Sequence, residues 1–316
     1  MKKYVFPAAL LLSVLLTACA TNDSVQSTAS AMQSSAASPC DNRVDGAAST
    51  PLQRSARDGD ITNVRCLLEH GAAVDAASRS GWTALMFAAN KKGKEHVGIA
   101  RLLLERGANS SVIDEDGINA LMYSANRGHP DTVRLLLEHG ANPNVTDENG
   151  WTPLIYAANK KGKEHVDIAR LLLERGASPN VVDKTDGWSA LMYAAYRGSP
   201  DTVRLLLDKG ADVHTTGKKK GWTPLMLAVQ EEGRTDIARL LLDRGANPNA
   251  ATTTGTTTLM IAAGNGNTDA VRLLIEKGAN INATDKDGDT ALSFAKKAKA
   301  NRNATIKVLR DAGAKE

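Results

Sequence analysis

A glycine recurs at nearly constant spacing through most of this chain, and a similar stretch of sequence follows each copy. The copies are Gly81, Gly117, Gly150, Gly187, Gly221, Gly255 and Gly288. Their spacing, roughly 35 residues, indicates a small supersecondary unit that is repeated along the chain. One such unit cannot bury its own apolar face, so its stability must come from stacking on its neighbours.

Within each unit the sequence predicts two short helices joined by a turn. Thr152, two residues after its glycine, can cap the first helix, and Pro153 suits the first turn of that helix. Apolar residues at helical spacing, such as Val133 and Leu136, then form a stripe on the second helix. Gly140 follows the stripe and permits the left-handed conformation that ends a helix.

The unit resembles the ankyrin repeat, and the resemblance covers about residues 49 to 314. It rests on sequences such as Gly150-Trp-Thr-Pro-Leu-Ile-Tyr-Ala-Ala, followed by Ile168-Ala-Arg-Leu-Leu-Leu-Glu-Arg-Gly-Ala. Eight units can be counted, from Thr50-Pro51-Leu52 to Gly313-Ala314. The resemblance implies an all-α solenoid of about eight helix-turn-helix repeats with β-hairpin fingers, and a function in binding proteins.

One position departs from the ankyrin pattern, in which His follows Thr-Pro-Leu. Here that position holds five methionines and one isoleucine: Met86, Met122, Ile155, Met192, Met226 and Met260. We expect thioether packing to replace a polar contact between repeats.

The repeats also nest in a larger unit of two. The segment Asn90 to His96 recurs two repeats later as Asn159 to His165, which indicates a tandem duplication of a two-repeat block. The second and fourth repeats carry three more residues than the third between the alanine pair and the leucine triplet. We expect these residues to enlarge the turn between the two helices.

The N-terminal segment, residues 1–18, is predicted to be an export signal. Lys2 and Lys3 precede an apolar run, Tyr4 to Leu16, that is too short to span a bilayer as a stable helix. The sequence Leu16-Thr17-Ala18-Cys19 then resembles the lipobox of bacterial lipoproteins. The alternative is an ordinary cleavable signal that a cysteine follows by chance.

The lipobox resemblance implies that Cys19 is acylated and becomes the new N-terminus. Ala20, and not Asp, follows the cysteine, which in that family implies sorting to the outer membrane. We therefore expect an outer-membrane lipoprotein of a Gram-negative bacterium that faces the periplasm. The predicted division is a signal peptide at 1–18, a flexible lipid-anchored tether at 19–48 and an ankyrin-repeat domain at 49–316. The tether is rich in Ser, Ala, Thr and Gln. It therefore cannot bury enough apolar surface to offset the entropy that it would lose on becoming ordered.

Charge and composition exclude several classes of function. The chain has 39 basic and 35 acidic residues, and removal of Lys2 and Lys3 leaves 37 against 35. This balance lacks the basic face of a nucleic-acid-binding protein. The six histidines show no short metal-ligand spacing, and no nucleophile, base and oxyanion donors can be assembled. We expect a monomer without catalytic activity, cofactor, metal or nucleic-acid partner.

The aromatic residues give the candidate partner-binding surface. All four tryptophans directly follow the repeated glycine: Trp82, Trp151, Trp188 and Trp222. In the ankyrin family this position and the first helix line a concave, ligand-binding face, and Trp and Tyr are enriched at binding hot spots. The alternative is that these side chains pack between neighbouring hairpins. Tyr196 lies outside the repeated aromatic rows and is the best single candidate, with Lys160 and Arg197 nearby.

Three lysine clusters allow two interpretations. They occupy turns at Lys91–Lys94, Lys160–Lys163 and Lys218–Lys220. They are either solvated turns or a means of steering an acidic protein partner to the surface.

Cys40 and Cys66 are the two cysteines that remain if Cys19 is acylated. An even pair in an oxidising compartment predicts a disulfide, which would close the loop from position 40 to position 66. The alternative is that Cys66, which replaces the first leucine of the triplet, belongs to the core.

Two functions fit this sequence. The first is an inhibitor or immunity factor for an enzyme that the protein meets in the periplasm. The second is a scaffold or accessory factor for resident envelope proteins.

Overall fold

The structure is a computed structural model that describes residues 40–42 and 49–315. The predicted signal, Cys19 and most of the predicted tether lie outside the described residues. The repeats belong to the unit Cys40–Glu316, and this unit is the one described below.

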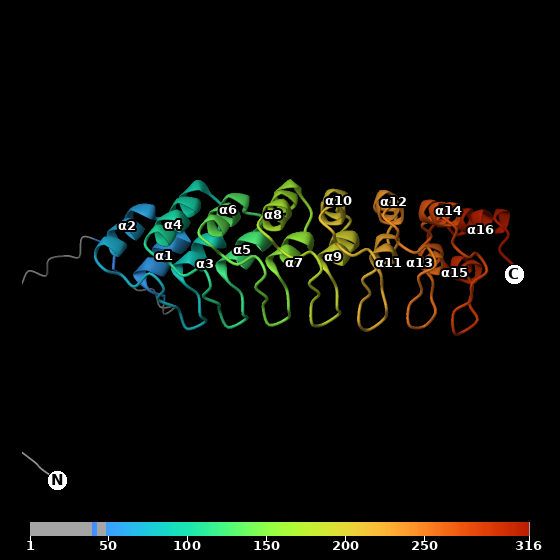
Figure 1. The fold of residues 1–316 in the computed structure, drawn as a ribbon, viewed down its shortest axis with the longest axis horizontal. Coiled ribbons are helices and arrows are strands. Elements are labelled where there is room, and N and C mark those ends of the chain that lie inside the picture. Colours follow the sequence, from blue (N-terminus) through green and yellow to red (C-terminus); the bar gives the residue numbers. More distant parts are fainter. Residues whose placement is uncertain (1–39, 43–48, 316) are drawn as a thin grey trace, which may run out of the picture. The chain divides into compact units, whose positions relative to one another are not determined.

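Sixteen helices in the described residues form eight consecutive pairs (Figure 1), which confirms the predicted all-α solenoid. The pairs are α1 (Pro51–Asp58) and α2 (Ile61–Glu69), α3 (Ala84–Ala89) and α4 (Lys94–Glu105), α5 (Ala120–Arg127) and α6 (Pro130–Glu138), α7 (Pro153–Ala158) and α8 (Lys163–Glu174), α9 (Ala190–Arg197) and α10 (Pro200–Asp208), α11 (Pro224–Ala228) and α12 (Thr235–Asp243), α13 (Thr258–Gly264) and α14 (Thr268–Glu276), and α15 (Ala291–Lys297) and α16 (Arg302–Asp311).

The helices form two layers within this unit. Each first helix packs on the first helix of the next repeat, and each second helix packs on the next second helix. The loops between repeats project from the layer of first helices (Figure 1). These fingers contain two isolated β-bridges, Val182 to Ser189 and Ala251 to Thr257, and the described residues include no extended strand.

Each first helix begins at a polar cap, as the sequence predicts. In all eight repeats the cap side chain accepts a hydrogen bond from a backbone N–H in the first turn; the caps are Thr50, Thr83, Asn119, Thr152, Ser189, Thr223, Thr257 and Thr290. Such a cap stabilises a helix by about 1 kcal/mol. Caps matter here because these helices are too short to form alone.

Glycine ends the second helices, again as predicted. Gly140 has φ +81°, and the amide of Ala141 donates to the carbonyl of Leu136 at 3.0 Å. A residue with a Cβ is strained in this left-handed conformation, so glycine suits the position.

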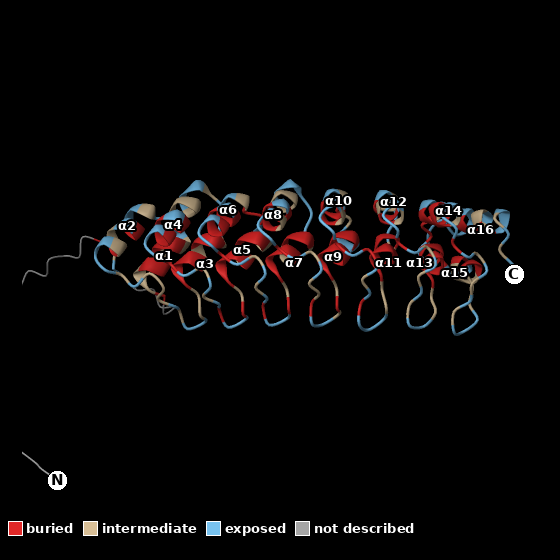
Figure 2. Cartoon of the chain, viewed as in Figure 1, coloured by how far each residue is buried: buried red, intermediate tan, exposed pale blue. Residues whose placement is uncertain are grey.

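The buried residues gather between the two layers, and exposed residues lie at the finger tips and on the side of the second helices that faces away from the first helices (Figure 2). The five methionines that replace the ankyrin histidine are fully enclosed: Met86, Met122, Met192, Met226 and Met260 are at most 1% exposed. Their burial agrees with the expected apolar packing between repeats. No helix among the described residues has the length and hydrophobicity needed to cross a bilayer.

The three extra residues of the second and fourth repeats do not simply enlarge a turn. In the second repeat the turn covers residues 90–93, whereas in the third repeat it covers only residues 128–129. The turn is longer because the first helix, α3, ends earlier than α5 does. The extra residues extend α4 and α8 to 12 residues, against 9 in α6 and α10. Pro130 fixes the start of α6, whereas Lys94 and Glu95 favour helix and allow α4 to begin earlier.

A disulfide joins Cys40 to Cys66 of α2 in this structure, with Cα atoms 5.6 Å apart. The same junction has a polar clamp: the Asp41 amide donates to Asn63 Oδ1 at 2.8 Å, and Asn63 Nδ2 donates to the Asp41 carbonyl at 3.1 Å. Arg54 also pairs with the Asp41 carboxylate at 3.3 Å. Residues 40 and 41 are therefore fixed on the first repeat by two independent means.

Candidate partner-binding surface

The tryptophans lie half-buried between neighbouring repeats. The ring centroid of Trp82 lies 4.9 Å from that of Phe87 in its own repeat and 4.4 Å from that of Tyr123 in the next repeat. Trp151 repeats this arrangement, at 5.1 Å from Tyr156 and 4.8 Å from Tyr193. Both tryptophans therefore contribute to repeat packing, which supports the structural alternative for these two positions.

The tryptophans do not form one continuous row. Ile118 follows the glycine of the third repeat, so it separates Trp82 from Trp151. Trp222 is half-buried against the core, but the aromatic positions of its own and the next repeat hold Leu227 and Ile261. Trp151 and Trp188 lie on adjacent repeats, and each has a tyrosine neighbour. No other pair of the four tryptophans meets both conditions.

Three tyrosines on the first helices hold the hairpins in place. The hydroxyl of Tyr156 donates to Asp147 Oδ2 at 2.7 Å, and Tyr193 donates to Asp183 Oδ2 at 3.1 Å. Tyr123 donates to Asp114 in the same way. Three repeats lack both the aspartate and the tyrosine. Their residues at these two positions are Ser78 with Phe87, Gly217 with Leu227, and Thr252 with Ile261.

Each of these aspartates also organises its own hairpin. Asp147 Oδ1 accepts the Trp151 amide at 2.8 Å, and Asp183 Oδ2 accepts the Trp188 amide at 3.0 Å. Burial, followed by the hydrogen bond to Asp147, raises the pKa of Tyr156 far above its ordinary value of 10.0. Burial and the charge of Asp183 likewise raise the pKa of Tyr193. The hydroxyl groups of Tyr123, Tyr156 and Tyr193 are therefore engaged in hydrogen bonds within the protein.

Tyr196 differs from these residues because its ring is not part of the core. It is 36% exposed, one of two large apolar side chains in the described residues that are exposed. Its ring contacts Trp188 edge-on at 5.6 Å, and the Arg197 guanidinium lies 5.5 Å from the ring centroid. An exposed aromatic ring with a cation on its face is suited to bind a partner.

Lys160 is brought to the same surface by a contact between repeats. Arg197 Nε donates to Asn159 Oδ1 at 2.7 Å, and Lys160 follows Asn159 at an exposed position of the turn. We name this surface, formed by Trp188, Tyr196, Arg197, Asn159 and Lys160, the Tyr196 patch.

The backbone of Tyr196 is supported by the sixth repeat. Arg234 donates to the Tyr196 carbonyl and also pairs with Glu231. His165 occupies the position equivalent to Arg234 two repeats earlier and contacts the Asn126 carbonyl at 3.3 Å. His96 does the same to Arg57 at 3.2 Å. His96 and His165 thus join neighbouring repeats.

The lysine-rich turns border two equivalent grooves between second helices. The first, about 590 Å³, lies between α4 and α6 and includes Lys92 and Asp131. The second, about 680 Å³, lies between α8 and α10 and includes Lys161 and Asp201. Both grooves mix basic and acidic side chains, which gives no single charge preference.

Three residues that support this site were not predicted from the sequence. Asp183 and Arg234 hold Tyr193 and Tyr196, and Asn159 holds Arg197. The two-repeat period relates Arg234 to His165 and was the available signal. His70 was also missed: it stands four residues after Cys66, a spacing that puts both side chains on one face of a helix.

Family models match most of the chain. A model described as ankyrin repeats in three copies matches residues 15–114, 96–183 and 164–252. A model described as ankyrin repeats in many copies matches residues 241–295. No curated protein matches the chain.

Proposed function

The chain belongs to the ankyrin-repeat family, and from that premise we propose that it binds a protein partner through the Tyr196 patch as a lipid-anchored envelope protein. Ankyrin repeats are protein-interaction modules, and the matches indicate no catalytic family. The observation that carries the choice of surface is the exposed Tyr196 ring, which contacts Trp188 edge-on and lies outside the core.

The chemistry of the patch favours a partner that presents an apolar side chain next to a carboxylate. The Tyr196 and Trp188 rings supply apolar area at low entropic cost, because each side chain has few rotatable bonds. Arg197 and Lys160 supply positive charge at the edge. Trp82, Trp151 and Trp222 stay predicted contacts for a partner that extends over further repeats.

The proposed place of action is the periplasmic face of the outer membrane. The Leu16 to Cys19 sequence supports a lipid anchor, and a disulfide between Cys40 and Cys66 fits an oxidising compartment. Metabolic labelling with a palmitate analogue tests the anchor. We expect label on the wild type and none on Cys19→Ser; equal label on both would contradict acylation at this cysteine.

For the specific role we propose inhibition of a periplasmic or imported enzyme, as an immunity protein does. A membrane anchor would concentrate the inhibitor where such an enzyme enters or works. The second candidate is a scaffold for resident envelope proteins, which the length of the array also favours.

Site-specific photo-crosslinking tests the proposed surface in the native envelope. A benzoylphenylalanine at position 196 should capture a partner, whereas the same probe at position 57 should not. Arg57 is the matched control because it occupies the equivalent helix position in the first repeat. Capture at 57 but not at 196 would rule out the Tyr196 patch.

The captured partner then decides the role. A tight complex in which the partner loses its enzymatic activity supports inhibition. Weaker binding to several partners that keep their activities supports the scaffold. Catalytic turnover by the purified chain, lost on substitution of one polar residue, would overturn both.

A further inference from the structure

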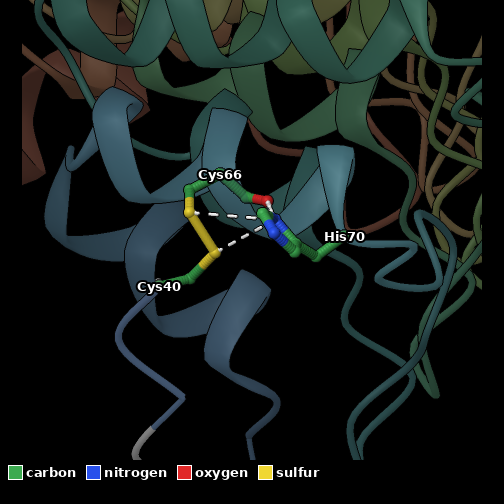
Figure 3. A group of neighbouring side chains, drawn as sticks. All are labelled: Cys40, Cys66 and His70. Atoms are coloured by element: carbon green, nitrogen blue, oxygen red, sulfur yellow. Dashed lines mark hydrogen bonds between the residues drawn. A yellow bond between two sulfur atoms is a disulfide. The ribbon is translucent and has the colours of Figure 1, made fainter. Parts of the chain in front are cut away.

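Three side chains with soft or borderline metal-ligand atoms meet at the first repeat (Figure 3). His70 Nδ1 lies 3.5 Å from Cys40 Sγ and 4.0 Å from Cys66 Sγ. Cys66 and His70 stand one turn apart on α2 and its C-cap, and Cys40 comes from the segment before α1. The sequence predicts no metal site on the spacing of the histidines alone, and that prediction takes no account of the two cysteines beside His70.

The third repeat shows which part of this arrangement is generic. His139 caps α6 as His70 caps α2, and its Nδ1 lies 3.0 Å from the Leu135 carbonyl. His70 Nδ1 makes the same contact with the Cys66 carbonyl at 2.8 Å. The histidine cap is therefore a feature of both repeats, whereas the two sulfurs beside it are particular to the first.

The position of Cys40 does not depend on the disulfide alone. Asn63 binds both the amide and the carbonyl of Asp41, the next residue. Arg54 pairs with the Asp41 carboxylate. These contacts do not involve either sulfur atom, so the disulfide is not the only constraint on the position of Cys40.

We propose that the reduced form of this cluster binds one Cu(I) ion through Cys40 Sγ, Cys66 Sγ and His70 Nδ1. A dithiol reductant first transfers two electrons and two protons to the disulfide and becomes a disulfide itself. Cu(I) then binds as the two thiols release their protons to solvent, so that two thiolates and one neutral imidazole surround the ion. His70 Nδ1–H donates to the Cys66 carbonyl in the oxidised form. On metal binding Nδ1 releases this proton to solvent and Nε2 takes one up, so that the imidazole stays neutral and its Nδ1 lone pair binds the ion.

The distances suit three ligands around one ion. With metal–sulfur and metal–nitrogen bonds of about 2.3 and 2.0 Å, a trigonal site separates sulfur from nitrogen by about 3.7 Å. The two sulfur–nitrogen distances here, 3.5 and 4.0 Å, lie on either side of this value. Reduction requires the two sulfurs to separate, but His70 needs little movement.

The ligand set selects the cation. Two thiolates favour a soft ion, and imidazole is also a copper ligand. Structural zinc sites are almost always completed by four protein ligands. Within the described part of the chain, the group of neighbouring ligands contains these three residues and no fourth His, Cys, Asp or Glu. Cu(I), which accepts three ligands, is therefore a better fit than Zn(II).

The test uses the full chain with Cys19→Ser, so that no third thiol is present. The protein is reduced without oxygen, freed of reductant and titrated with Cu(I) buffered by bicinchoninate, whose colour reports copper transfer. We expect the reduced chain to take one equivalent and the oxidised chain to take none. This comparison needs no substitution at the site and so does not depend on a variant that folds.

Variants then assign the ligands. Cys66→Ser should abolish tight binding, and His70→Asn should weaken it by more than about tenfold, since loss of a supporting outer-shell contact alone costs that much. His139→Asn is the matched control and should bind as the parent does. Circular dichroism of each variant checks that the repeats are folded.

Three results would overturn the proposal. One is equal copper binding by the oxidised chain. Another is unchanged affinity in His70→Asn, which would reduce the site to a two-coordinate thiolate pair. The third is a reduced chain that retains Zn(II) but loses Cu(I) to the competitor.

Discussion

Arg234 donates a hydrogen bond to the backbone carbonyl of Tyr196, although the two residues belong to different repeats. The bond fixes the backbone of Tyr196 and leaves its ring exposed. Support and recognition are therefore separated at this residue: the sixth repeat holds the main chain, and the side chain is available to a partner. This separation lets substitutions distinguish binding from folding.

Tyr196→Ala should weaken partner binding without destabilising the chain. A binding anchor costs about 2 kcal/mol when it is truncated, which is roughly a thirtyfold loss of affinity. The melting temperature should stay near that of the wild type, because the ring is not packed on the core. Titration and thermal melting measure the two effects, and wild-type affinity in the folded variant would contradict the assignment.

Trp151→Ala should show the opposite behaviour. Its ring packs on Tyr156 and on Tyr193 of the next repeat, so its removal opens a gap between repeats. Loss of such an aromatic side chain should lower the free energy of unfolding by about 2 kcal/mol or more. Urea denaturation measures this loss; a stable variant with weakened partner binding would instead make Trp151 a direct contact.

Tyr156→Phe should destabilise the array although it removes only one oxygen atom. Asp147 is 4% exposed and would lose the hydroxyl that donates to Oδ2. An unsatisfied buried acceptor costs about 1–3 kcal/mol. Tyr196→Phe is the control and should leave the free energy of unfolding unchanged. Equal stabilities of the two variants in urea would show that the Tyr–Asp pair is not structural.

Acidification should destabilise the third repeat through His129. Burial lowers the pKa of His129 below its ordinary value of 6.5, while its bond to the Ala89 carbonyl opposes this shift. The unfolded chain therefore takes up the proton first as the pH falls. Stability from this residue is present above the ordinary pKa, decreases below it and becomes constant below the folded pKa.

Denaturation at a pH of about 7.5 and about 5.5 measures this effect. His129→Gln should lose less stability between the two pH values than the wild type. His214→Gln, at an exposed position, is the control. A wild-type pH response in His129→Gln would assign the acid sensitivity to other groups.

Loss of the disulfide should destabilise the first repeat. For a sequence separation of 26 residues, the chain-entropy model predicts a contribution of about 3.5 kcal/mol. Cys66→Ala should lower the free energy of unfolding by up to that amount, since the Asn63 clamp remains. Thiol titration of the unfolded protein, isolated without reductant, provides the direct check, and two reactive thiols besides Cys19 would contradict the pairing.

The regular features of the fold could be predicted because each depends on local sequence. The caps at Thr83 and Thr152 and the helix end at Gly140 follow from residue type and position within one repeat. Repetition then turns a weak local signal into a strong one. The extended start of α8 was missed because the alignment of repeats located three extra residues but not whether they were helical.

The candidate site was predictable only in part, because its contacts join different repeats. The position after each glycine identified Trp188, and the departure from the aromatic rows identified Tyr196. The bonds from Arg197 to Asn159 and from Arg234 to Tyr196 span 38 residues each and depend on side-chain direction. The tyrosines of the first helices are a similar case, because their sequence position is compatible with ligand binding and with packing. The structure shows that their hydroxyl groups donate to aspartates of the hairpins.

The disulfide also determines how mechanical force would enter the array. A pull applied before Cys40 passes through the sulfur bridge directly to Cys66 in α2. Residues 41–65, which include all of α1, then form a closed loop beside the loaded path. A protein tethered by its N-terminal end would therefore withstand tension without first peeling α1 from the stack, and in the reduced chain this protection would depend on the weaker clamp at Asp41.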